Sequence, residues 1–211
     1  MAAHDTRLLL LGAVALFEPV NGYQIRRELM SWQVDQWAHV NPGSIYSGLS
    51  TLTKQGHLVR HDLVDGGREV AVYELTASGR AELDRLVEVA LTTVDLYDAV
   101  GLHVALGLLP LIDRPTAVRH LSARLRALDD LLLHLEGVTG STTAPPHATR
   151  SMALPLLRGR AERAWLVEML DDVRSGQLFF RDEPFAWAPT QDDPGWQMNA
   201  DRERYRALLG R

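Results

Sequence analysis

A short stretch in the first quarter of the chain carries side chains suited to binding a polyanion. Residues 41–46 read Asn-Pro-Gly-Ser-Ile-Tyr; Asn41 is predicted to cap a helix with its side-chain oxygen, and Pro42 takes the first helical position. The face predicted to lie in solvent holds hydroxyl groups and one cation, and no acid: Ser44, Tyr46, Ser47, Ser50, Thr51 and Lys54. Such a face can donate hydrogen bonds to phosphates and base edges without repelling them.

The apolar positions of this stretch predict how the helix is held. Ile45, Leu49 and Leu52 recur at helical spacing, and Gly56 is expected to end the helix. Taken alone, the pattern fits an ordinary amphipathic helix equally well, so the neighbouring segments decide between the two interpretations.

Two helices are predicted upstream of this stretch. Residues 8–16 form an apolar run that Glu18-Pro19 closes, and residues 21–24, Asn-Gly-Tyr-Gln, have the pattern of a capping box. The helix that follows has Ile25 and Leu29 on one side and two arginines near the other.

A hairpin is predicted downstream. Strand-like residues 58–64 and 70–73 flank residues 65–68, Asp-Gly-Gly-Arg, and Asp-Gly is a strong hairpin signal. Three helices followed by a two-stranded hairpin with an arginine at its tip is the element order of a winged helix-turn-helix. In that fold the third helix enters the major groove and the hairpin lies along the DNA backbone.

These motifs resemble the PadR family of bacterial transcriptional regulators. The resemblance is carried by residues 22–25, 42–46, 52–56 and 73–76 together with Gly79. It covers residues 7–83 closely and 84–175 only in helical pattern. The chain departs from the family where Ser47 replaces a usual proline and where Glu69, in place of a basic run, follows Arg68.

The resemblance implies a mainly α fold with a small β-hairpin. Residues 1–80 would form the winged helix, 81–176 a helical dimerisation and effector domain, and 177–211 an aromatic, proline-rich extension. The implied function is a homodimeric repressor that binds a near-palindromic operator in double-stranded DNA and is released by a small aromatic ligand. The candidate DNA-binding residues are Tyr23, Arg26, Arg27, Ser44, Tyr46, Ser47, Ser50, Lys54 and Arg68.

Charge is the feature that argues against DNA binding. The chain has a net charge of −5, and residues 1–80 hold 7 Lys/Arg against 8 Asp/Glu, a balance of −1. Nucleic-acid-binding domains are usually basic, although the distribution of charge matters more than its sum. The alternative is a ligand-binding or protein-interaction scaffold that keeps the winged-helix fold without sequence-specific DNA binding.

The composition narrows the classes of protein to which the chain could belong. Cysteine is absent and no apolar run is long enough to span a membrane, so a cytoplasmic protein is expected. Nucleophile elbows, phosphate-binding glycine loops and metal-ligand spacings are also absent. We therefore expect no enzyme, no metal and no cofactor.

The second half of the chain is predicted to be helical. A heptad stripe over residues 83–97 and two helices at about 115–135 and 152–174 are separated by a loop at 137–150. Residues 201–209 should form a short last helix within a tail that contains Trp187 and Trp196. The predicted dimerisation residues are Leu83, Val87, Ala90, Val94 and Trp165. The predicted effector pocket consists of Tyr97, Trp165 and Met169.

Overall fold

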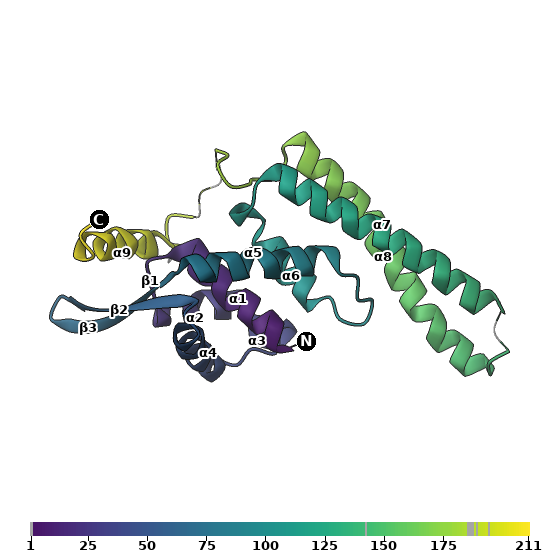
Figure 1. Ribbon diagram of the computed structural model, residues 1–211, viewed down its shortest axis with the longest axis horizontal. Helices are drawn as coiled ribbons and strands as arrows, with labels where there is room; N and C mark the ends of the chain where they lie inside the picture. Colours follow the sequence, from purple (N-terminus) through teal and green to yellow (C-terminus); the bar gives the residue numbers. More distant parts are fainter. Residues whose placement is uncertain (1, 142, 185–187, 189, 194) are drawn as a thin grey trace. The chain divides into compact units, whose positions relative to one another are not determined.

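The computed structural model describes residues 2–141, 143–184, 188, 190–193 and 195–211 (Figure 1). Its chain folds into two compact units, one of residues 1–87 with 185–211 and one of residues 88–184. The predicted Trp187 lies outside the described residues. The fold is mainly α with a small antiparallel sheet, as the sequence predicts.

The first unit is a winged helix. Its helices are α1 (Ala2–Phe17), α2 (Gly22–Ser31), α3 (Val34–Trp37) and α4 (Pro42–Lys54), followed by the first part of α5 (Ala77–Thr92). The core is made by the apolar run of α1 and by the predicted inner faces of α2 and α4. Ile25, Leu29, Ile45 and Leu49 are completely buried, which confirms how both helices face.

The sheet has one strand more than predicted. The hairpin of β2 (Leu58–Asp65) and β3 (Arg68–Leu75), here called the wing, is extended by β1 (Val20–Asn21) on the other edge of β3. Register runs from Leu58 opposite Leu75 to Asp65 opposite Arg68. Gly66 and Gly67 form the two-residue turn with φ of 56° and 80°, which is the left-handed backbone that such a tight turn requires.

A last helix completes this unit. α9 (Gly195–Leu208) buries Met198 and Tyr205 against the winged helix. In Figure 1 it lies above the wing, whereas α4 lies below. The sequence predicted a short helix here, at about 201–209, but gave no indication of what it contacts.

The second unit is built on two long antiparallel helices. α7 (Arg114–Ser141) and α8 (Pro146–Ser175) pack along each other, and Gly159 approaches Leu132 so closely that an added Cβ would lie 2.7 Å from its Cδ2. A shorter helix, α6 (Val100–Gly107), and a 3-10 turn (Leu109–Leu111) precede them and were not predicted. Within the described residues, no helix is long and apolar enough to cross a membrane.

Two predicted boundaries in this half are wrong. Helix α5 ends at Thr92, so Val94 and Tyr97 do not continue its heptad stripe. The predicted loop at 137–150 is mostly helical, because α7 continues to Ser141 and α8 begins at Pro146. The Gly, Thr and Pro residues of this segment have low helix propensities, which predict a loop. Packing between the two long helices outweighs these propensities and keeps most of the segment helical.

Candidate nucleic-acid interface

Helix α4 begins and ends where the sequence placed it, but its N-terminus is held differently. Pro42 occupies the first turn and Gly56 follows the helix end at φ 76°. The predicted Asn41 side-chain cap is wrong: that side chain makes no capping hydrogen bond. Instead, the Ser44 hydroxyl donates a hydrogen bond to the Asn41 carbonyl oxygen at 2.6 Å. Asn41 therefore contacts the first turn through its backbone carbonyl and not through its side chain.

Several hydroxyls on the exposed face of α4 are already engaged as donors. Ser47 Oγ donates to the Ser44 carbonyl at 3.0 Å, and Thr51 Oγ1 donates to the Ser47 carbonyl at 2.8 Å. These groups can still accept hydrogen bonds. Within the part of the chain that the structure describes, Tyr46, Ser50 and Lys54 have no hydrogen-bond partner, which leaves them as the available donors of the helix.

Tyr46 is half exposed and rests on α2. A Cβ built on Gly22 would lie 3.1 Å from Tyr46 Cε1, so the absence of a side chain at Gly22 makes room for the ring. Tyr23, the next residue of α2, is 61% exposed. The Gly-Tyr and Ile-Tyr motifs therefore meet where Tyr46 lies against Gly22.

The predicted cations divide into two groups. Arg26, Lys54 and Arg68 are exposed and have no acidic partner among the described residues. Arg27 is half buried, donates to Glu28 at 2.9 Å and lies 3.5 Å from the sulfur of Met198. Three of the four predicted cations are thus free to bind phosphate, and the fourth is used inside the unit.

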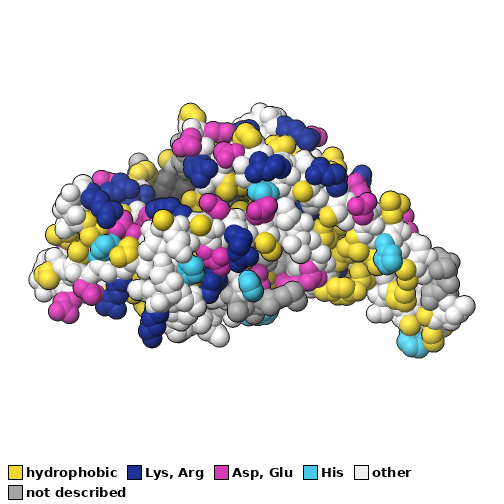
Figure 2. Space-filling view, viewed as in Figure 1, with side chains coloured by type: hydrophobic (Ala, Val, Ile, Leu, Met, Phe, Trp, Pro, Cys, Tyr) yellow, Lys and Arg dark blue, Asp and Glu magenta, His cyan; other side chains and the backbone are white. Residues whose placement is uncertain are grey.

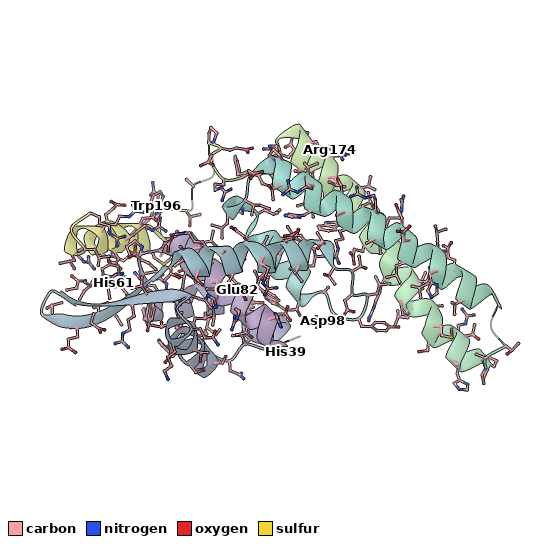
Figure 3. The ribbon with its side chains drawn as sticks, viewed as in Figure 1. His39, His61, Glu82, Asp98, Arg174 and Trp196 are labelled. Atoms are coloured by element: carbon pink, nitrogen blue, oxygen red, sulfur yellow. The ribbon has the colours of Figure 1, made fainter. Side chains whose placement is uncertain are left out.

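The acids of this unit are mostly paired. Glu82 of α5, labelled in Figure 3, lies between Arg85 at 2.8 Å and Arg7 of α1 at 3.1 Å. These hydrogen bonds, first from Arg85 and then from Arg7, lower the pKa of Glu82 to about 2 against the opposing effect of burial. Helix α4 carries no acid, so its exposed face stays free of negative charge although the whole chain is acidic.

Residues 10–85 match the model described as the transcriptional regulator PadR-like family. Residues 10–85 form a PadR-like domain. The resemblance predicted from the sequence is confirmed over this range, and the family is one of transcriptional regulators.

Two solved structures of Bacillus subtilis PadR are also similar to the chain, one in complex with operator DNA and one with p-coumaric acid. The first is 20% identical and covers 79% of this chain and 98% of its own at a TM-score of 0.33. The second is 20% identical and covers 80% and 97% at a TM-score of 0.30. No curated protein matches the chain. The match to the family is thus confined to residues 10–85.

Side chains that the sequence did not single out join the PadR-like domain to α9. Asp201 of α9 accepts a hydrogen bond from Gln24 of α2 at 2.7 Å, and Tyr205 accepts one from Asn21 at 2.9 Å. Gln24 was identified only as part of the capping box, which the structure confirms. The sequence shows acids and arginines spaced along α9, but it does not show that residues of α9 bond to Asn21 and Gln24.

The predicted dimerisation residues lie mostly inside the chain. Leu83 and Val87 are only 5% and 2% exposed, and Ala90 is half buried. Val94 packs against a cluster of buried leucines that consists of Leu96, two leucines of α7 and one of α8. Most of this stripe is therefore covered within a single chain; of the five predicted residues, only Trp165 of α8 is exposed, at 38%.

The predicted effector residues lie on two different parts of the second unit. Tyr97 is 80% exposed, between α5 and α6, whereas Trp165 and Met169 lie one turn apart on α8. A groove of about 300 Å³ between α7 and α8 is lined by other residues, among them Leu125, Arg126, Val167 and Leu170. No cluster of His, Asp or Glu among the described residues could hold a metal ion.

Proposed function

We propose that the chain is a homodimeric repressor that binds a near-palindromic operator in double-stranded DNA. The observation that carries this proposal is the exposed face of α4, which has no acid and presents Tyr46, Ser50 and Lys54 as available donors. Arg26 of α2 and Arg68 of the wing add two cations that have no acidic partner among the described residues. Free cations bind phosphates, and donors on a recognition helix bind base edges. The charge of the α4 face supports DNA binding, although the net charge of the whole chain does not.

A charge inserted into this face tests the proposal. Ser50→Glu should weaken binding to the DNA upstream of the chain's own gene at least tenfold, because a carboxylate facing phosphates is repelled. The matched control is Ala207→Glu, which adds the same charge to an exposed position of α9. Gel shifts at two salt concentrations measure both. If the wild type shows no binding that exceeds its binding to random DNA, the scaffold function becomes the better description.

We also propose that α8 contributes to the dimer. Leu154, Leu157 and Trp165 are 49%, 59% and 38% exposed, and with the exposed Ala161 they recur at spacings of three and four. Figure 2 shows hydrophobic side chains on the surface at the α7–α8 end of the molecule. A stripe of this kind along a helix is typical of helix pairing. We propose this stripe of α8 as the dimer contact in place of the predicted positions on α5, which are buried within the chain.

Sedimentation of the intact protein at micromolar concentration tests the dimer. Leu157→Arg should shift the protein toward the monomer because it places a charge in an apolar contact. Gln177→Arg, beyond the end of α8, is the control and should leave the sedimentation coefficient unchanged. A wild type that is monomeric at this concentration would contradict the proposal.

The proposed regulation is release from DNA by a small aromatic ligand. Trp165 and Met169 share one side of α8, next to the apolar stripe, so a ligand there would contact the helices that set the spacing of the two recognition helices. A ligand acts only through different affinities for the DNA-binding and free forms. Tryptophan fluorescence titrations with phenolic compounds, paired with gel shifts, test this; Trp165→Phe is the control. Quenching without any change in the gel shift would exclude the site.

A further inference from the structure

Helix α9 reaches the tip of the wing through one arginine. Arg204 donates from Nε and Nη2 to Asp65 Oδ2 at 2.9 and 2.8 Å, and from Nη2 to Asp201 Oδ1 at 2.7 Å. Asp65 is the last residue of β2 and directly precedes the glycine turn. These charge-assisted bonds raise the pKa of Arg204, and the hydrogen bond that it donates to Asp65 is the largest cause. The Asp65 carboxylate is therefore neutralised from α9.

Arg204 is placed by buried contacts of its own helix. Asp201, one turn before it, also accepts a hydrogen bond from Gln24, which is 3% exposed. Gln24 in turn accepts a hydrogen bond from the Asn21 backbone N–H at 3.1 Å, and Tyr205, 2% exposed, is bonded to the Asn21 side chain. The contact with the wing is thus the end of a network that begins in the capping box of α2.

The sheet register gives Asp65 a second possible partner. Asp65 lies directly opposite Arg68 across the turn. Opposed residues of an antiparallel pair have Cβ atoms about 4.5–5.5 Å apart, and opposite charges at such positions attract each other. In the structure, however, the acid bonds to Arg204, and Arg68 is exposed without an acidic partner among the described residues.

We propose that Arg204 is a positioning residue of the DNA interface. It holds the carboxylate of Asp65 and so leaves Arg68, at the wing tip, free to contact a phosphate. The partner of the freed cation is the backbone of double-stranded DNA, so this inference rests on the proposed function. Helix α9, which lies outside the range matched by the family, thereby contributes to binding without touching DNA.

Four variants of the full chain test the proposal in gel shifts across a salt series. Arg204→Ala should let Asp65 pair with Arg68 in both protomers. The loss of one phosphate contact per protomer, two per dimer, should weaken binding about thirtyfold at 0.15 M salt and reduce the salt slope by about 1.8. Arg68→Ala should give the same two changes, and Arg68→Ala with Arg204→Ala should add nothing further. Asp65→Asn with Arg204→Ala should restore both, because no acid remains to bind Arg68.

The control is Arg206→Ala, which removes an exposed arginine whose partner, Glu203, lies on the same helix. It should leave the affinity and the salt slope as in the wild type. Circular dichroism confirms that each variant is folded. If the Asp65→Asn double variant stays as weak as Arg204→Ala, the arginine acts by bracing α9 and the charge proposal is wrong. A wild type that binds DNA while Arg204→Ala binds equally well would overturn this inference alone; a wild type that does not bind would overturn the proposed function.

Discussion

The two sides of the winged-helix unit use arginine in opposite ways. Around α4, the exposed cations of α2, α4 and the wing tip have no acidic partner among the described residues. On α9, Arg202 donates to backbone carbonyls, and Arg204 and Arg206 pair with acids, as does Arg211 beyond the end of the helix. A count of basic residues would rate α9 as the better DNA-binding surface. What distinguishes the two sides is which cations are still free to exchange counterions for phosphates.

The comparison predicts that removing a paired arginine lowers stability, and Arg202 should show the largest effect. Its guanidinium donates to the carbonyls of Leu16 and Phe17 at 3.1 Å each, at the C-terminus of α1. Burial lowers its pKa, so the charge is partly removed from water. Arg202→Ala should reduce the free energy of unfolding by about 3 kcal/mol, because two carbonyls lose a charged donor.

Urea unfolding followed by circular dichroism measures this loss. Arg206→Ala is the control on the same helix; its exposed pair with Glu203 should be worth no more than about 0.5 kcal/mol. Equal losses in the two variants would show that α9 is not held through its contact with α1, and the distinction between the two sides would fail.

On the α4 side, substitutions should instead lower operator affinity, most strongly at Tyr46. Tyr46→Ala should weaken operator binding by about 1–3 kcal/mol, the size of a good specific contact, with little change in melting temperature. Tyr46→Phe separates the contribution of the hydroxyl to operator binding from that of the ring, which covers Gly22. If Tyr46→Ala unfolds the protein while binding per folded molecule is normal, the ring belongs to the core.

A smaller effect separates the free from the engaged cations of the predicted interface. Lys54→Ala should reduce the salt slope of DNA binding by about 1.8, because each neutralised phosphate contributes about 0.9 and the dimer carries two copies of Lys54. Arg27→Ala should leave the slope unchanged, since Arg27 is bonded to Glu28 within the unit. Equal changes in slope for the two variants would mean that pairing in the free protein does not predict contact with DNA.

The smallest effect concerns acid stability. The pKa of Glu82 falls from 4.5 to about 2 on folding, so its contribution is fully present above about pH 4.5 and is lost as the pH falls toward 2. Glu82→Gln should therefore be less stable than the wild type at pH 6, and the two should converge near pH 2. Unfolding free energies across this range measure the difference. Asp84→Asn is the control, because Asp84 is exposed on the same helix; this variant should lose stability at acid pH as the wild type does.

The parts of the fold that were predicted from the sequence depend on neighbouring residues. The α2 capping box, the bounds of α4 and the turn at Gly66-Gly67 each need side chains or backbone conformations within a few positions of one another. Local rules of this kind can be evaluated without knowing the rest of the chain.

The parts that were missed depend on distant contacts. β1 has only two residues, too few for any alternation to be visible, and it exists because β3 offers an open edge. Leu83 and Val87 follow a heptad pattern, which predicts an apolar face but does not say whether the same chain or a second copy covers it. The hydrogen bonds that Arg27, Ser44 and Ser47 make within the chain also depend on the folded structure and could not be predicted from the sequence.

The docking of α9 also sets an order of events during synthesis. The winged-helix unit is discontinuous, because residues 185–211 reach it only after the ribosome has made the whole of residues 88–184. Contacts such as Asn21 with Tyr205 close a loop of more than 180 residues, and closing long loops slows folding. Domains fold in the order in which they are made. The nascent winged helix therefore waits, without its last helix, until the second unit has been translated, and during that interval Asp65 has Arg68 across the turn but not yet Arg204.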